Sequence, residues 1–169
     1  PQYAGDQEYR TQRLEAYPWF LTYMKQQTDG EFWRKNALQW QYEKLKIPTY
    51  LIGGLLDGYR DTVVRILENG KSIVKGVIGP WNHSWPDDGE PGPNYEWRYE
   101  AVRWWDQWLK GQDTGVLDQP PLAVFVREGH APSTDLKVTP GQWRFENWPI
   151  KRTRWSSLYF SEDHQLIHS

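Results

Sequence analysis

Two side chains of this sequence, Asp57 and His83, are of the types and in the positions needed for acid–base chemistry. Each follows a short apolar run that ends in glycine, Gly53-Gly54 before the aspartate and Gly79-Pro80 before the histidine. A carboxylate that accepts a hydrogen bond from one imidazole nitrogen fixes the tautomer of the ring and stabilises its protonated form. The other nitrogen can then take a proton from a serine and return it to a leaving group.

An alternation of strand, helix and strand would bring these two side chains together. Thr49–Ile52 form an apolar run typical of a strand that is buried on both faces of a parallel sheet. Residues 61–69 place apolar side chains at helical spacing, and Ile73–Ile78 form a second apolar run. A crossover of this length returns the second strand parallel to the first. Because chemistry gathers at the carboxyl ends of parallel strands, Asp57 and His83 should meet at one edge of the sheet.

The connecting helix carries a second carboxylate, Asp61, which is a rival for the role of the acid. It lies in the first turn, where a negative charge is already explained by the helix dipole, and Asp57 is therefore preferred. Gly70 is expected to end this helix in a left-handed conformation. The alternative for Asp57 and His83 themselves is that both are ordinary surface or capping residues.

Both loops resemble those of a known enzyme group. The strings IPTYLIGGLLDGY and VIGPWNHS are similar to the acid and histidine motifs of α/β-hydrolases of the cocaine esterase and X-Pro dipeptidyl peptidase (CocE/NonD) family. Gly-Pro-Trp-x-His is the more specific motif, whereas Leu55 stands where members often carry an aromatic residue. The likeness continues through EAVRWWDQWLKG and PPLAVFV. It implies an enzyme that cleaves ester or amide bonds, with Asp57 and His83 as its catalytic acid and base.

The nucleophile of that family is not found in this sequence. It sits in a G-x-S-x-x-G turn upstream of the acid, but every serine here follows Asp57 and none has those flanking glycines. The resemblance therefore predicts a fragment, inactive alone, of a serine hydrolase that acts on a small acyl ester, an amide or an X-Pro peptide. The alternative is a non-catalytic, hydrolase-like scaffold that binds a glycan or a protein partner.

Pattern and resemblance together predict an α/β fold in three parts. Residues 1–45 are expected to be the end of a helical cap, with helices over 3–17 and 19–27 and short helical turns over 31–45. Residues 46–111 are expected to be the C-terminal part of the hydrolase core, a partial parallel sheet with helices. Residues 112–169 should begin a truncated, jelly-roll-like β-sandwich, with strands at Leu122–Val126, Gln142–Phe145 and Ser157–Phe160.

A helix is predicted for Tyr95–Lys110, directly after the histidine loop. Asn94 is its expected N-cap, and Gly111 its end. Its apolar stripe should pack on the sheet and so fix where His83 points. The stripe comprises Tyr95, Val102, Trp105 and Leu109, flanked by Trp108.

Charge and composition narrow the function further. With 20 basic and 22 acidic residues the net charge is -2, which gives no electrostatic case for nucleic acid or an anionic membrane as a partner. The absence of cysteine excludes disulfides and thiolate metal sites. Neither Asp87-Asp88 with Glu90 nor the pair His164 and His168 has a full set of metal ligands, so no metal or cofactor is expected. Compartment and oligomeric state are left open.

Overall fold

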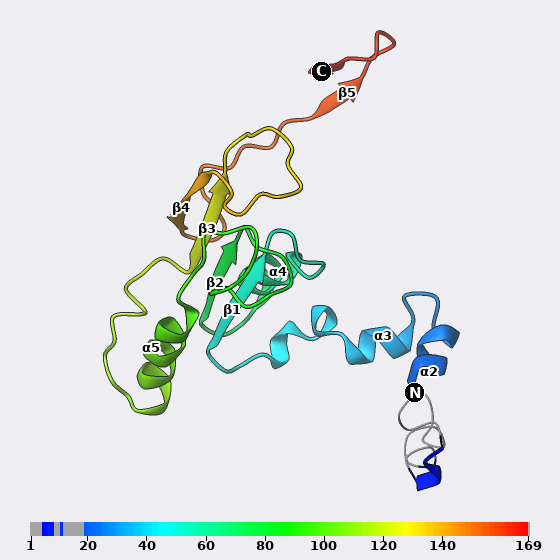
Figure 1. Ribbon diagram of the computed structural model, residues 1–169, viewed down its shortest axis with the longest axis vertical. Helices are drawn as coiled ribbons and strands as arrows, with labels where there is room; N and C mark the ends of the chain where they lie inside the picture. The colour runs from blue at the N-terminus through cyan, green and yellow to red at the C-terminus, as the bar shows by residue number, and fades with distance from the viewer. Residues whose placement is uncertain (1–4, 9–10, 12–18, 169) are drawn as a thin grey trace. The chain divides into compact units, whose positions relative to one another are not determined.

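The computed structural model of the protein describes residues 5–8, 11 and 19–168 (Figure 1). Its contacts divide the chain into two units, residues 1–42 and residues 43–169. Both Asp57 and His83 belong to the second unit. No helix in the described part of the chain has the length and apolar character needed to cross a membrane.

Short helices make up the described part of the first unit and its junction with the second. They are α2 (Trp19–Lys25), α3 (Glu31–Asn36), and the 3-10 helices η1 (Leu38–Trp40) and η2 (Tyr42–Lys44). Helix α2 is two residues shorter than predicted, and the short helical turns predicted over 31–45 are confirmed. The helix predicted over 3–17 falls mostly outside the described residues.

A four-stranded mixed sheet in the order β1-β2-β3-β4 forms the centre of the second unit (Figure 1). The strands are β1 (Thr49–Gly54), β2 (Val74–Gly79), β3 (Leu122–Arg127) and β4 (Gly141–Glu146). The first three are mutually parallel, and β4 runs antiparallel to β3. In the β1–β2 pair Thr49 lies opposite Val74 and Gly54 opposite Gly79, so the two strands end level. The parallel return predicted from the crossover is therefore confirmed.

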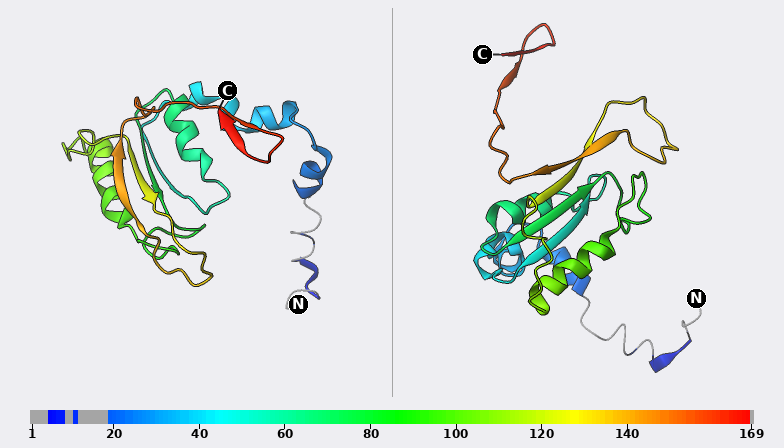
Figure 2. Two further views of the ribbon diagram at one scale, coloured as in Figure 1. Left: turned by 90° about the horizontal axis from the view of Figure 1, so that it is seen from above. Right: turned by 90° about the vertical axis from the view of Figure 1, so that its left-hand side faces the viewer.

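Helix α4 (Asp61–Asn69) covers one face of the sheet and α5 (Trp97–Leu109) the other (Figure 2). Val63 of α4 forms the core on its face with Ile78 and Leu122. Each such buried side chain contributes about 1.5–3 kcal/mol through removal of apolar surface from water. On the other face the ring of Trp104 in α5 meets that of Tyr50 at 5.5 Å. The alternation of side chains along β1 thus supplies a separate packing surface to each helix.

Helix α4 has the predicted bounds, but Gly70 ends it differently from the prediction. Its φ of -58° and ψ of 143° are an extended conformation, not the left-handed one. Space is the reason for glycine here, because a Cβ would lie 2.7 Å from the carbonyl oxygen of Ile66 and 3.0 Å from Val74 Cγ2. Gly111, by contrast, follows α5 with a φ of +65°, as expected.

The start and the buried face of α5 differ from the prediction. Glu96, not Asn94, caps the helix, and its carboxylate accepts from the backbone N–H of Arg98 at 3.3 Å. The buried residue is Trp104, and Trp108 packs beside it. The predicted inward stripe is exposed at Val102, Trp105 and Leu109. Tryptophans on several sides of this helix form two apolar stripes, and the buried one contains Trp104, whose ring packs against Tyr50 of β1.

A lysine, Lys75, is buried in the middle strand β2. Its ammonium donates to the carbonyl oxygen of Val116 at 2.6 Å and to that of Gln119 at 3.3 Å. Burial lowers the pKa of Lys75 from its ordinary value. These hydrogen bonds attach the segment between α5 and β3 to the sheet.

The predicted β-sandwich is not confirmed. Strand β3, at its predicted position, continues the sheet of β1 and β2 through parallel pairing with β2. The remaining described strands, β5 (Leu158–Phe160) and β6 (Leu166–His168), form an antiparallel hairpin. Sequence period alone could not show which sheet a strand joins, because alternation describes a strand's two faces and not its edges.

Candidate active site

Two loops leave the level ends of β1 and β2 and are hydrogen-bonded to each other. The backbone N–H of Leu55 donates to the carbonyl oxygen of Gly79 at 2.8 Å, and that of Leu56 donates to Trp81 at 3.1 Å. The first loop continues to Asp57 and the second to His83. Parallel pairing thus extends past the strands and delivers both side chains to the same place.

Trp81 fills the space between these loops. Its side chain is fully buried and lies against the glycines that end both strands. A Cβ on Gly54 would lie 2.7 Å from Trp81 Cδ1, and one on Gly79 would overlap the six-membered ring. Trp143 of β4 supports the indole from the sheet side at 6.1 Å between ring centroids. The glycines and the tryptophan of the two motifs are therefore a packing unit that sets the distance between the loops.

Asp57 and His83 are hydrogen-bonded, as the sequence predicts. Oδ2 of the aspartate lies 2.8 Å from Nδ1 of the histidine. An ionised carboxylate only accepts, so Nδ1 carries the proton and Nε2 of the neutral ring is left as a base. Among the hydrogen bonds of the described residues, this is the only one that His83 makes. Its side chain is 78% exposed and that of Asp57 15%, so the base faces solvent while its partner is enclosed.

The second carboxylate oxygen of Asp57 is also held. Oδ1 accepts from the backbone N–H of Tyr59 at 2.8 Å, and this bond and the one from His83 lower the pKa of Asp57 below its ordinary 3.8. The ring of Tyr59 lies 5.9 Å from that of His83. This support was not predicted from the sequence, although an aspartate in a turn commonly accepts a hydrogen bond from the backbone N–H two residues further on.

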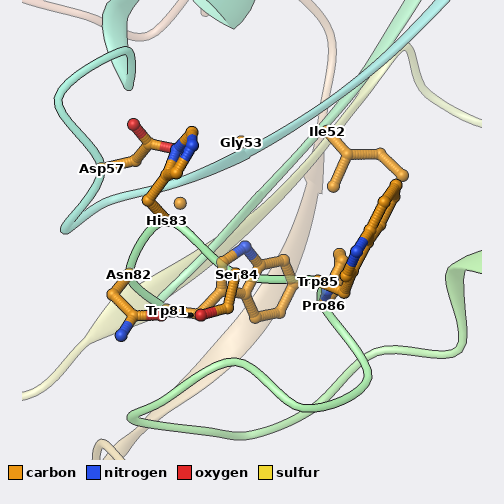
Figure 3. Close-up of a pocket in the computed structure, with 10 residues that line it drawn as sticks. Ile52, Gly53, Asp57, Trp81, Asn82, His83, Ser84, Trp85 and Pro86 are labelled. Carbon is orange, nitrogen blue, oxygen red and sulfur yellow. Dashed lines mark hydrogen bonds and ion pairs between the residues drawn. The ribbon is translucent and has the colours of Figure 1, made fainter. Parts of the chain in front are cut away.

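A pocket of about 400 Å³ opens beside the pair. It is lined by Ile52, Gly53, Gly54, Asp57, Trp81, Asn82, His83, Ser84, Trp85 and Pro86. Figure 3 shows Asp57 and His83 on one side of it, with Ile52 and the ring of Trp85 on the other. Such a volume suits a small organic molecule. The pocket can therefore present a polar reacting group to the imidazole and an apolar group to the opposite wall.

The other sequence candidates lie elsewhere or are already paired. Asp61 is exposed and pairs with Arg60 and Arg65 at 3.8 and 3.9 Å, not with His83. Ser84 lines the pocket, but its hydroxyl donates to Asn82 Oδ1 at 2.6 Å. No hydrogen bond among the described residues joins a serine to His83.

The acidic loop after the histidine is engaged in hydrogen bonds and ion pairs. Asp87 accepts from the indole of Trp97 at 2.8 Å, and Glu90 pairs with Lys137 at 3.0 Å. In the part of the chain that the structure describes, no three histidine, aspartate or glutamate side chains are grouped to hold a metal ion.

Comparison with known proteins finds a family match over the segment that holds this site. The model of the X-Pro dipeptidyl-peptidase (S15) family matches residues 2–85, which include both Asp57 and His83. The matched segment, just under half of the chain, is similar to that family. The family resemblance of the two motifs is thereby confirmed.

Two mycobacterial proteins and a staphylococcal one are similar to the chain. Proteins of Mycobacterium bovis and Mycobacterium tuberculosis, each named "Putative serine esterase", are 31% identical over 96 residues, which cover 53% of this chain and 13% of each esterase. A crystal structure of a CocE/NonD family hydrolase from Staphylococcus aureus superposes with a TM-score of 0.64 at 15% identity, over 94% of this chain and 28% of that one. A second crystal structure of that hydrolase gives a TM-score of 0.61. This likeness shows an α/β-hydrolase-like fold, and the chain spans only a small part of each relative.

Proposed function

We propose that this chain supplies the acid and the base of a serine hydrolase that cleaves ester or amide bonds. The observation that carries the proposal is the 2.8 Å hydrogen bond between Asp57 Oδ2 and His83 Nδ1, with the second carboxylate oxygen held by Tyr59. The match to the X-Pro dipeptidyl-peptidase family model supports the hydrolase class, and the names of the mycobacterial relatives favour an esterase.

His83 and Asp57 have different roles in the proposed cycle. His83 Nε2 removes the proton from a serine hydroxyl as the oxygen attacks the substrate carbonyl, and it then gives that proton to the departing alcohol or amine. A water molecule, deprotonated by the same nitrogen, then attacks the acyl-serine, and His83 returns that proton to the serine oxygen as the acid leaves. Asp57 keeps the proton on Nδ1 and stabilises the imidazolium that forms twice in each cycle.

The serine and the donors that stabilise the oxyanion are proposed to lie outside this chain, in a longer protein. No serine precedes Asp57 in the sequence, and the order serine, acid, histidine is that of α/β-hydrolases. The acyl pocket and the choice among simple esters, amides and X-Pro peptides would then depend partly on segments beyond these residues.

Substitutions in the full-length protein test this proposal. We expect His83→Ala and Asp57→Asn each to lower kcat by about 10⁴-fold, because the residual rate comes from binding and oxyanion stabilisation alone. Asp61→Asn is the matched control, since this carboxylate is exposed and pairs with arginines. It should stay within about twofold of wild type.

A fluorophosphonate probe separates enzyme from scaffold. Labelling of one serine upstream of this chain, lost in His83→Ala, is the result expected of the enzyme. Full activity in His83→Ala or in Asp57→Asn would refute the assigned roles. Absence of labelling, together with retained binding of a glycan or protein, would favour the non-catalytic scaffold instead.

A further inference from the structure

The wall of the pocket opposite the catalytic pair is a tryptophan whose position is fixed by its neighbours. Trp85 lies two residues after His83, lines the pocket, and is 65% exposed. One face of its indole stacks on Trp97, with centroids 4.9 Å apart and 17° between the planes. Trp97 therefore covers one face of the ring and leaves the other face available to contact a ligand in the pocket.

The ring of Trp97, which covers one face of Trp85, is itself held by neighbouring side chains. The indole N–H of Trp97 donates to Asp87 Oδ1 at 2.8 Å, and Arg98 bonds to the other carboxylate oxygen of Asp87. The guanidinium of Arg98 also lies 5.6 Å from the centre of the Trp97 ring. Because Trp97 is the first residue of α5, this network anchors the loop that carries Trp85 and Asp87 to a regular helix.

We propose that Trp85 determines substrate specificity: its free face binds a planar, apolar ring carried by the ester or amide whose carbonyl lies beside His83. This inference rests on the proposed function. Stacking on Trp97 already restricts the rotation of the Trp85 side chain. A ligand ring can therefore stack on Trp85 without the entropic cost of ordering this indole. Ile52, on the same side of the pocket, adds an aliphatic contact to the edge of such a ring (Figure 3).

Three small esters separate a ring-binding role from a packing role in the full-length enzyme. Methyl phenylacetate carries a ring on the acyl side of the scissile bond, benzyl acetate carries one on the alcohol side, and ethyl acetate carries none. The measured quantity is the kcat/KM of each aromatic ester divided by that of ethyl acetate, because this ratio cancels any loss of folded enzyme.

We expect Trp85→Leu to lower the ratio for one of the two aromatic esters by about tenfold, and Trp85→Phe to retain most of it, since phenylalanine keeps a flat face. Trp155→Leu is the matched control, because Trp155 is 96% exposed and lies outside the pocket lining. It should leave both ratios within about twofold of wild type. Unchanged ratios in Trp85→Leu, or an equal fall in Trp155→Leu, would overturn the proposal.

Binding measurements keep this inference separate from the catalytic one. In the His83→Ala protein, titration calorimetry with phenylacetate, benzyl alcohol and acetate reports on the pocket without turnover. We expect one aromatic ligand to bind more tightly than acetate, and Trp85→Leu to weaken its binding about tenfold. Absence of ester hydrolysis by the wild-type full-length protein, with this binding pattern intact, would refute the proposed function alone. Equal affinities for the aromatic ligands and for acetate would refute the specificity role of Trp85, whatever the esterase activity of the wild-type protein.

Discussion

Replacing Gly54 by alanine tests how the fold sets the distance between the acid and the base. Gly54 is the last residue of β1 and lies three positions before Asp57. A methyl group there would overlap the carbonyl oxygen of Trp81 and would lie 2.7 Å from its Cδ1 and 2.9 Å from the carbonyl oxygen of Asn82. Two of these three atoms belong to the backbone of the loop that carries His83. No side-chain rotation can therefore remove the overlap.

The size of the overlap gives the expected displacement. Ordinary van der Waals contact begins at about 3.4 Å, so relief of the 2.7 Å contact alone needs a shift of about 0.7 Å. If the loops separate by this amount, the Asp57–His83 hydrogen bond lengthens from 2.8 Å to about 3.5 Å, outside the normal range. Overpacking of a buried site costs about 1–3 kcal/mol, and misplacement of catalytic groups by about 1 Å costs about 10²-fold in rate.

We therefore expect Gly54→Ala to lower kcat by about 10- to 100-fold and the free energy of unfolding by about 1–3 kcal/mol. Ester hydrolysis by the full-length protein gives the first quantity, and urea unfolding followed by tryptophan fluorescence gives the second. The control is Gly58→Ala, next to Asp57, where an added Cβ has no neighbour within 4 Å. That variant removes a glycine from the same loop without any collision.

The two variants together decide the question. A Gly54→Ala enzyme with the kcat and stability of Gly58→Ala would refute the inference that the packing of Trp81 against Gly54 holds the loops in register. Loss of stability with unchanged kcat would show that the loops adjust without moving His83 away from Asp57.

Two further predictions concern titration and burial. The pKa of Asp57 is lowered in the folded protein, so its ionised form stabilises the fold above pH 3.8 and this contribution is lost as the pH falls below that value. The melting temperature of wild type should accordingly exceed that of Asp57→Asn near neutral pH, and this difference should vanish in acid. A difference that grows in acid would contradict the lowered pKa of Asp57. Lys75→Met should lower the free energy of unfolding by about 1–3 kcal/mol in urea, because it leaves the buried carbonyl oxygen of Val116 without a partner. An unchanged urea midpoint would mean that relief of the buried charge offsets the lost hydrogen bond.

The position of each candidate residue along the chain could be predicted because local patterns determine it. Apolar runs that end in glycine marked β1 and β2, and helical spacing marked α4 between them. Parallel return of the second strand then placed Asp57 and His83 at one edge, where the structure has them at 2.8 Å. These steps depend only on neighbours in sequence and on the handedness common to all such crossovers.

The buried face of α5 could not be predicted in the same way. Its sequence WRYEAVRWWDQWL offers two apolar stripes, and the choice of Trp104 over Trp105 depends on Tyr50, which lies far away in sequence. The burial of Lys75 depends likewise on carbonyl oxygens more than forty positions further along. Packing between distant segments decides such questions, and periodicity carries no information about it.

The order of residues along the chain is enough to show which side chains could act as acid and base, and which strands bring them to one edge. Their surroundings depend on packing in the folded chain: the Tyr59 N–H that donates to Asp57, the Trp81 packing that sets the distance between the loops, and the stacked Trp85 across the pocket. The reason is physical. Strand and helix formation follow from local residue patterns, whereas hydrogen-bond partners and ring contacts are fixed only when segments distant in sequence meet.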